Sequence, residues 1–270
     1  MGSCRNKRSS EVECLKALKK LKEGDEKLRG CQLSDEFLLR FVRGKNCDSK
    51  SAFETLKNYA HIRRDKYRHL FANYHPSTVR HVFDSGMIRV LKHRDDFGRP
   101  VFVMRTDSWD VTEISINDIL ITTLLILEEL LYSKETQEKG VVIIRDYDKF
   151  GLSHMRLCTL GEIKKACTIF VNSFPCKYKA AHIIRNSYFF HCLLSMAKPF
   201  MPSKLRDRFF VHGWNMDSLY AHVSPDVLPE FLGGRLSEED AWDTSLEERI
   251  FKNDENFRNV NSNFITGGSL

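Results

Sequence analysis

Apolar residues in the first quarter of the chain recur at the three- and four-residue spacing of amphipathic helices. The recurring positions are Val12, Leu15, Leu18 and Leu21 in one stretch, and Ala52, Phe53, Leu56 and Tyr59 in another. Ser34 and Asp48 stand where N-caps are preferred, and Gly44 marks a helix end. We predict a small helical domain over residues 11–75, preceded by a disordered basic segment at residues 1–10. The pattern leaves open whether these helices form a domain of their own.

From Met87 onward the pattern changes to short apolar runs that alternate with longer helical stretches. The predicted strands are 87–92, 101–105, 141–144, 180–184 and 209–212, and the predicted helices are 115–140, 153–172 and 188–200. Strands that alternate with helices indicate an α/β sheet with parallel pairs. We assign this domain to residues 76–250. The Asn-rich segment that follows, residues 251–270, is predicted to be a mobile tail.

The predicted helix 188–200 is apolar, and clusters of cations precede and follow it in the sequence. Lys177 and Lys179 lie on one side of it, and Lys204, Arg206 and Arg208 lie on the other. An apolar surface with a basic rim suits the surface of a membrane that carries anionic headgroups. This segment therefore predicts a peripheral membrane contact.

Composition and motifs exclude several other classes. The chain has 270 residues, 42% of them hydrophobic, and a net charge of +6, which also fits an anionic partner. The longest apolar run, 114–132, contains Asp118, Glu128 and Glu129, so it is too short to span a bilayer and we predict a soluble protein. The eight cysteines include no CxxC pair, and we expect them to be reduced.

The sequence contains no assembled catalytic or ligand-binding motif. It has neither a P-loop nor a GxGxxG segment, its ten histidines have no metal-ligand spacing, and its basic residues show no nucleic-acid recognition pattern. Asp146 and Asp148 end a predicted strand, where a turn-capping role is favoured over catalysis. We predict no enzyme activity, no cofactor, no metal site and no nucleic-acid partner.

Seven segments carry a resemblance to a known family. They are Asp35–Lys45, Glu135–Gly140, the strand that ends at Asp146, Ser173-Phe174-Pro175, Lys198-Pro199-Phe200, His212-Gly213 and Leu228-Pro229-Glu230-Phe231-Leu232-Gly233-Gly234. In order and spacing they resemble the CRAL-TRIO lipid-binding family, and within it the α-tocopherol transfer protein group, with the retinaldehyde-binding protein as a near relative. The resemblance covers roughly residues 11–250.

The resemblance implies a helical N-terminal domain and an α/β domain whose sheet forms the floor of a closed apolar pocket under a mobile lid helix. The positions that it assigns to the lipid pocket are Leu120, Thr123, Leu127, Val141, Arg145, Ile169, Phe170 and Phe174. In the lid segment, the apolar positions are Phe189, Phe190, Leu193, Met196 and Phe200. The phosphoinositide-binding positions are Lys177, Lys179, Lys204 and Arg208, all basic here.

The resemblance thus implies a monomeric cytoplasmic carrier that holds one hydrophobic lipid, vitamin E (tocopherol) or a relative, and transfers it to membranes that contain phosphatidylinositol bisphosphate. The alternatives are a retinoid carrier and a phosphoinositide-responsive regulatory or scaffold protein without obligatory cargo. Arg145 stands at an apolar pocket position of the family, and a cation there is costly unless it is paired. It either turns away, pairs with an acid, or meets a polar group of the ligand.

Overall fold

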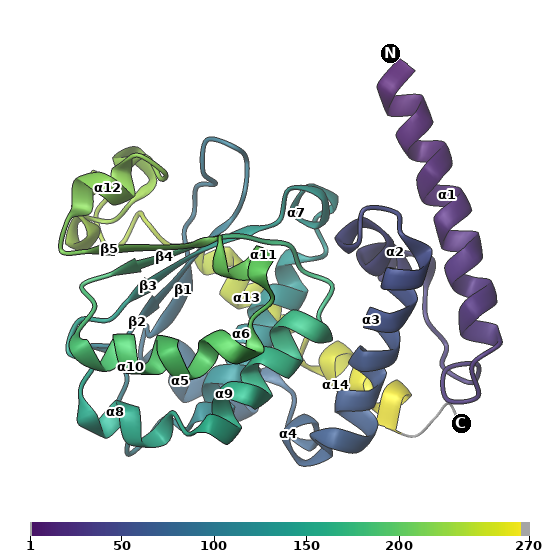
Figure 1. Cartoon of the computed structure of the whole chain (residues 1–270), viewed down its shortest axis with the longest axis horizontal. Coiled ribbons are helices and arrows are strands. Elements are labelled where there is room, and N and C mark those ends of the chain that lie inside the picture. Colours follow the sequence, from purple (N-terminus) through teal and green to yellow (C-terminus); the bar gives the residue numbers. More distant parts are fainter. Residues whose placement is uncertain (1, 266–270) are drawn as a thin grey trace. The chain divides into compact units, whose positions relative to one another are not determined.

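The structure, a computed structural model, describes the backbone of residues 2–265 and the side chains of residues 10–264. The chain divides into two units (Figure 1). The helical unit comprises the chain up to Tyr74, the segment Thr168–Cys176 and the chain from Glu255 onward. The sheet unit comprises His75–Cys167 and Lys177–Asp254.

The helical unit is held together by an aromatic core. Its elements are α1 (Gly2–Glu23), α2 (Asp35–Gly44), α3 (Ser49–His61), η1 (Ile62–Lys66), α4 (Arg68–Ala72), η3 (Thr168–Asn172) and most of α14 (Asp254–Ile265). The predicted caps are confirmed, since Ser34 accepts from the Phe37 N–H and Asp48 from the N–H of Ser51. The Tyr59 ring lies 5.5 Å from that of Phe41 and 5.2 Å from that of Phe264.

Both ends of the chain differ from expectation. Helix α1 begins at Gly2, where the sequence predicted disorder over residues 1–10, because no glycine or proline interrupts the helix before Glu23. Residues 251–270 were predicted to be mobile, but α14 buries Phe257, Asn261 and Phe264. These three residues have the 3–4 spacing of a helix face, which the Asn-rich composition obscured. Residues 266–270 lie outside the described residues.

The sheet unit contains a five-stranded sheet in the order β1-β2-β3-β4-β5, with β1 antiparallel to β2 and all other pairs parallel. The strands are β1 (Ile88–Val90), β2 (Val101–Arg105), β3 (Val141–Asp146), β4 (Tyr178–Ile184) and β5 (Phe209–Gly213). The predicted mixed α/β architecture is therefore confirmed. Each of the three predicted helices, 115–140, 153–172 and 188–200, is divided into two or three shorter helical elements.

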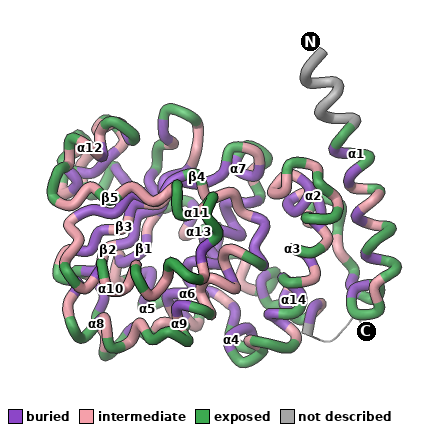
Figure 2. The backbone as a smooth tube through the Cα atoms, viewed as in Figure 1, coloured by how far each residue is buried: buried purple, intermediate pink, exposed green. Residues whose placement is uncertain are grey.

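The helical elements of this unit alternate with its strands. They are η2 (Pro76–Val79), α5 (Arg80–Asp84), α6 (Ile116–Leu130), α7 (Lys134–Lys139), α8 (Leu152–Leu157), α9 (Leu160–Cys167), α10 (Tyr188–Ala197), η4 (Lys198–Phe200), α11 (Ser203–Arg206), α12 (Met216–Tyr220), η5 (Pro225–Val227), η6 (Glu230–Leu232) and α13 (Thr244–Lys252). Ser115 and Asp118 form a capping box at the start of α6, and every residue from Ile119 to Leu130 is buried (Figure 2). Within the described part of the chain, no helix is long and apolar enough to cross a membrane.

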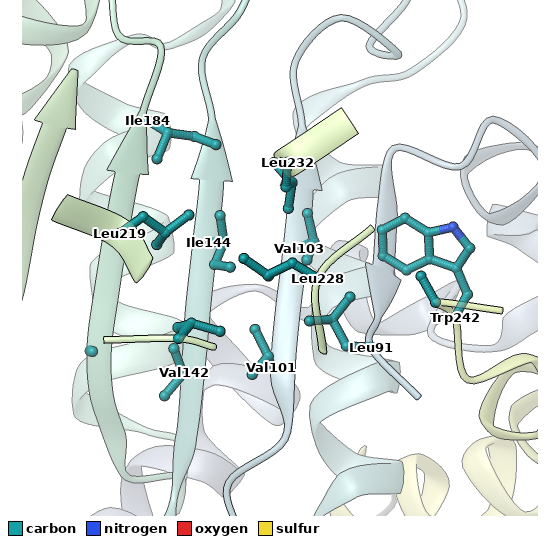
Figure 3. Close-up of a cluster of buried hydrophobic side chains, with 13 residues drawn as sticks. Leu91, Val101, Val103, Val142, Ile144, Ile184, Leu219, Leu228, Leu232 and Trp242 are labelled. Atoms are coloured by element: carbon teal, nitrogen blue, oxygen red, sulfur yellow. The ribbon is translucent and has the colours of Figure 1, made fainter. Parts of the chain in front are cut away.

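One face of the sheet carries the main hydrophobic core of the unit. Because side chains alternate along each strand, one face presents Val101, Val103, Val142, Ile144, Ala180 and Ile184. Leu219 of α12 and the later residues Leu228, Leu232 and Trp242 pack on this face (Figure 3). Strand register sets Val103, Ile144 and His182 side by side on it.

Candidate lipid-binding face and basic cluster

The opposite face of the sheet keeps accessible surface at its centre. It carries Phe102, Met104, Ile143, Arg145, Ala181 and Ile183, by alternation with the packed face. Strand β3 is the middle strand of five, yet its Ile143 and Arg145 are only half-buried, whereas Val142 and Ile144 on the packed face are fully buried at 0% exposure. Accessible side chains in the middle of a sheet indicate that the elements covering this face do not fill it.

Helix α10 lies on this side of the sheet together with α8 and α9, against which it packs (Figure 1). Its sequence, YFFHCLLSMA, is apolar on nearly all sides, as in a fully buried helix. Only Phe190 is buried, however, and Tyr188 is 76% exposed. The other apolar side chains are half-buried, namely Phe189, Leu193, Leu194 and Met196. The helix thus has more apolar surface than its present contacts cover.

Contacts at its first turn hold α10 to the sheet. The Phe190 ring lies 4.6 Å from the ring of Tyr147, which directly follows β3. The Ser187 hydroxyl donates to the Phe150 carbonyl at 2.9 Å, and the rings of Tyr147 and Phe150 are 5.1 Å apart. The second half of α10, from Leu193, has no such buried anchor. Phe190 was among the predicted lid residues, whereas Tyr147, Phe150 and Ser187 were not predicted, because they become its neighbours only through the fold.

The four predicted phosphoinositide-binding residues all lie in the sheet unit, around the amino ends of β4 and β5. The Arg208 guanidinium donates to the Tyr178 carbonyl at 2.6 Å, and Lys177 and Lys179 flank Tyr178 in the chain. The Ala181 N–H donates to the Arg208 carbonyl at 2.8 Å, which joins the two strands at this point. Lys204 lies on α11, just before Arg208. We call these four residues the basic cluster.

The four residues of the basic cluster differ in their exposure and in the hydrogen bonds that they make. Arg208 is half-buried and holds the backbone of β4, and Lys177 donates to the Glu138 carbonyl at 3.4 Å. Lys179 and Lys204 are exposed, and among the described residues neither forms an ion pair. Gly140 (φ 81°) passes close to this point, since a Cβ there would lie 2.3 Å from the Lys177 carbonyl oxygen. Lys179 and Lys204 are thus the members most available to a phosphate.

The predicted pocket residues fall into two groups. In the sheet unit, Leu120, Thr123 and Leu127 of α6 and Val141 of β3 are buried, Leu127 at 1% and Val141 at 0% exposure. Ile169 (buried), Phe170 (half-buried) and Phe174 (buried) belong to the helical unit. The half-buried Ile143 was not among the predicted residues. The sequence could have indicated Ile143, because it lies two residues before Arg145 and side chains two residues apart in a strand share a face.

Arg145 has no acidic partner among the described residues. Its guanidinium carbon lies 5.4 Å from the centre of the Tyr147 ring. Burial raises the pKa of both Tyr147 and Cys158, and the positive charge of Arg145 opposes that rise in each case. The adjacent Asp146 points to the other face, where it pairs with Arg185. Pairing with an acid of the protein, one of the three possibilities for Arg145, is therefore not observed among these residues.

The carboxylate of Asp146 has a structural role. It accepts from the Arg185 Nε at 3.0 Å and from the Asp148 N–H at 3.0 Å. These contacts agree with the capping role that the sequence favoured over catalysis. Among the residues that the structure describes, no group of three or more His, Cys, Asp or Glu side chains could hold a metal ion.

The helical unit contains a polar pocket of about 400 Å³. Its lining includes Lys45, Asn58, His61, Lys66, Thr168 and Asn172. Such a lining does not suit an apolar molecule, because binding one would bury polar groups without partners. This pocket is therefore not a candidate for the lipid.

Comparison with known proteins identifies the family. Residues 84–234 match the CRAL/TRIO domain. The chain is 35% identical over 216 residues to an "Alpha-tocopherol transfer protein-like" protein of Mus musculus, which covers 79% of this chain and 63% of that protein. It is 33% identical over 227 residues to "Clavesin-1" of Xenopus laevis, covering 82% of this chain and 68% of that protein. The match thus spans less than two thirds of the length of the first of these relatives.

A solved structure shares the fold. It is described as "Crystal structure of Sfh5", and it superposes with a TM-score of 0.56 at 14% identity, covering 90% of this chain and 98% of that one. At that identity the likeness concerns the fold alone. From the domain match and the two relatives, the chain belongs to the CRAL-TRIO family of lipid-binding and lipid-transfer proteins.

Proposed function

We propose that this protein carries one hydrophobic lipid in a closed pocket between the Ile143 face of the sheet and the helices α8–α10. The observation that carries the proposal is α10, an apolar helix with one buried residue over a sheet face that is half-buried at its centre. A lipid in this space would cover both apolar surfaces. Each Å² of apolar surface removed from water contributes about 25 cal/mol. A long-chain lipid could therefore be held with few polar contacts, and no covalent step is needed.

Release of such a lipid requires the cover to move, and α10 is suited to move as a lid. Phe190 and Ser187 hold its first turn, whereas its second half, Leu193–Ala197, and the following η4 contain no buried residue. We propose that the basic cluster binds the phosphate groups of a phosphoinositide, since Lys and Arg form charge-assisted hydrogen bonds with phosphate. A headgroup bound there opens the lid only if it binds the open state better. In the open state, the apolar side chains of α10 would enter the lipid surface.

The relatives support this proposal at the level of the class. One of them is named for α-tocopherol transfer, which supports a hydrophobic cargo and leaves the chemistry of its head group open. We propose that the carrier works as a cytoplasmic monomer that visits membranes peripherally and reversibly. It acts by binding and transfer and not as an enzyme.

Filling the space next to Ile143 is expected to prevent lipid binding. Ile143→Trp adds volume at a half-buried position on the Ile143 face of the sheet. The larger side chain should therefore displace a bound lipid before it disturbs the core on the packed face. We expect lipid recovered from the purified variant to fall at least tenfold below that from the wild type. Native mass spectrometry and extraction of bound lipid measure this occupancy.

A matched control separates pocket filling from a general effect of tryptophan. Val12→Trp places the same side chain on α1 at a position that is 49% exposed. It should leave the lipid content unchanged. If Ile143→Trp keeps full occupancy while it remains folded, the lipid does not bind at this face.

Removing two cations of the basic cluster is expected to slow delivery. Lys179→Ala with Lys204→Ala leaves Arg208 and its bond to Tyr178 in place. Each cation near an anionic membrane contributes roughly 1 kcal/mol, so the double variant should bind phosphoinositide vesicles about 10- to 30-fold more weakly. Transfer of a fluorescent lipid to these vesicles should slow, whereas its affinity in solution should not change. High salt should reproduce part of the defect in the wild type.

The control for this variant is Lys16→Ala with Lys20→Ala, which removes the same charge from exposed positions of α1. It should retain most of the transfer rate. Equal rates for both double variants would mean that net charge, and not the basic cluster, directs the protein to these vesicles.

A further inference from the structure

Arg145 is a cation on an otherwise apolar sheet face. Register places Met104 on one side of it and Ile183 on the other, with exposed fractions of 8% and 0%. Ile143 lies two residues earlier on the same face, at a spacing of roughly 6–7 Å. A charged side chain at the centre of such a face is unfavourable unless another group compensates it.

The described residues supply only the Tyr147 ring, whose centre lies 5.4 Å from the guanidinium carbon. None of them accepts a hydrogen bond from the Arg145 guanidinium, and none places a carboxylate within ion-pair distance of it. The nearest acid in the sequence, Asp146, is held by Arg185 on the opposite face. The charge of Arg145 acts on the side chains of Tyr147 and Cys158. Burial raises the pKa of both, which favours their uncharged, protonated forms, so neither supplies a negative charge. The half-buried guanidinium thus lies beside accessible apolar surface with no hydrogen bond or ion pair to the described residues.

The chemistry of arginine defines which ligand group would fit. Its planar fork donates two parallel hydrogen bonds to a carboxylate or a phosphate, and it keeps its charge at any physiological pH. The fixed end of α10 lies near this point, because Tyr147 contacts both Arg145 and Phe190. The accessible apolar surface extends from there past Ile143. A ligand with an acidic head at Arg145 and a hydrocarbon tail along Ile143 would pair with the guanidinium and cover the apolar surface.

We propose that the cargo is an anionic amphiphile, a long-chain lipid whose single carboxylate or phosphate head binds Arg145. This inference rests on the proposed carrier function and specifies the class of lipid. Arg145 is then the residue that determines specificity, and a neutral lipid of the same length would leave its charge unpaired. Discrimination on this basis is strong, because a neutral lipid that covers this half-buried guanidinium would bury its charge without a partner.

The test compares matched probes at pH 8, where a carboxylic acid is ionised. Oleic acid and oleyl alcohol share one tail and differ in the head, oleoyl lysophosphatidic acid replaces the carboxylate with a phosphate, and α-tocopherol is a bulky neutral lipid. The wild type is expected to bind oleate about 10- to 100-fold more tightly than oleyl alcohol. Arg145→Leu should abolish this preference without weakening the binding of oleyl alcohol. Arg145→Lys, which keeps the charge but not the fork, should retain part of it.

The control variant is Arg156→Leu, which removes an exposed arginine of α8 and should keep the wild-type preference. The lysophosphatidic acid and oleate arms show which acidic head is preferred. The preference for oleate over oleyl alcohol is the ratio of the two affinities. If this ratio is the same in the wild type and in Arg145→Leu, the inference is wrong, but the carrier function is not contradicted. Binding of none of the four probes to the wild type would instead contradict the carrier function itself.

A second measurement does not depend on a folded variant. Organic extracts of the purified wild-type protein, analysed by mass spectrometry, should contain an acidic single-headed lipid in stoichiometric amount. A stoichiometric neutral lipid in its place would overturn the inference.

Discussion

Replacing Arg185 with leucine is expected to lower the free energy of unfolding by about 3–5 kcal/mol. The reason is the carboxylate of Asp146, which is 2% exposed and accepts from the Arg185 Nε at 3.0 Å. Without Arg185 this carboxylate stays buried with only the Asp148 N–H as a donor. Removing one partner of a buried ion pair leaves an uncompensated charge, which is the costly case. Urea unfolding followed by circular dichroism measures the change.

The double variant Asp146→Asn with Arg185→Leu tests this explanation. It removes both charges, so much of the stability should return, and the double-mutant cycle should show a coupling of at least 1 kcal/mol. Arg235→Leu is a control, because Arg235 pairs with Asp226 at the surface, where both side chains are exposed, and it should cost about 1 kcal/mol or less. If the single and double Arg185 variants are equally unstable, the ion pair is not the source of the loss.

This ion pair also bears on the proposed lid. Arg185 follows β4 with φ 48°, a left-handed conformation, and only two residues separate it from α10. Its N–H donates to the Gly213 carbonyl at 2.6 Å at the end of β5. The pair thus fixes the point at which the chain leaves the sheet and enters the lid. We expect a less stable anchor to raise the spontaneous loss of bound lipid.

The sequence was sufficient for features that depend on local physics. Ser34 and Asp48 cap helices as predicted, because a side-chain oxygen near free N–H groups needs no long-range information. The short apolar runs 101–105 and 141–144 predicted strands correctly, because the signal of a buried strand lies in its own residues. The family resemblance named the four residues of the basic cluster, two just before or in β4 and two shortly before β5, and their role stays a prediction.

Features that depend on pairing between distant segments were not predictable in this way. Whether Arg145 or Asp146 faces the packed core depends on the register of β3 against its neighbours, and the sequence alone left the orientation of Arg145 open. The partner of Asp146 lies 39 residues away, at Arg185. Phe257 and Phe264 are buried by helices from the other end of the chain, so composition alone suggested a mobile segment.

The packed face of the sheet carries a cluster of histidines that the scattered sequence positions did not predict. His182 of β4 is 1% exposed, and its ring lies 5.2 Å from that of His212 and 5.1 Å from that of His222. The His182 Nδ1 is 3.0 Å from the His212 Nε2. Burial, followed by the charges of His212, His222 and Arg99, lowers the pKa of His182 to about 3. Burial also lowers the pKa of His212.

Acid is therefore expected to destabilise the protein through His182. The unfolded chain binds a proton at this residue below its ordinary pKa of 6.5, whereas the folded protein remains unprotonated until pH falls to about 3. The stabilising contribution is fully present above pH 6.5 and is lost as pH falls through the window from 6.5 to 3. At about 1.4 kcal/mol per pH unit, roughly 2–3 kcal/mol should be lost by pH 4.5.

The variant His182→Gln removes this titration and keeps a polar side chain next to His212. Its free energy of unfolding at pH 7 should be lower by about 1–2 kcal/mol, because the ring contacts are lost. Between pH 6.5 and pH 4.5, however, it should lose roughly 2–3 kcal/mol less than the wild type, so the two stability curves converge in acid. Urea unfolding at several pH values gives both curves, and His93→Gln, at an exposed loop position, should follow the wild type. Parallel curves for His182→Gln and the wild type would show that His182 does not carry the acid sensitivity.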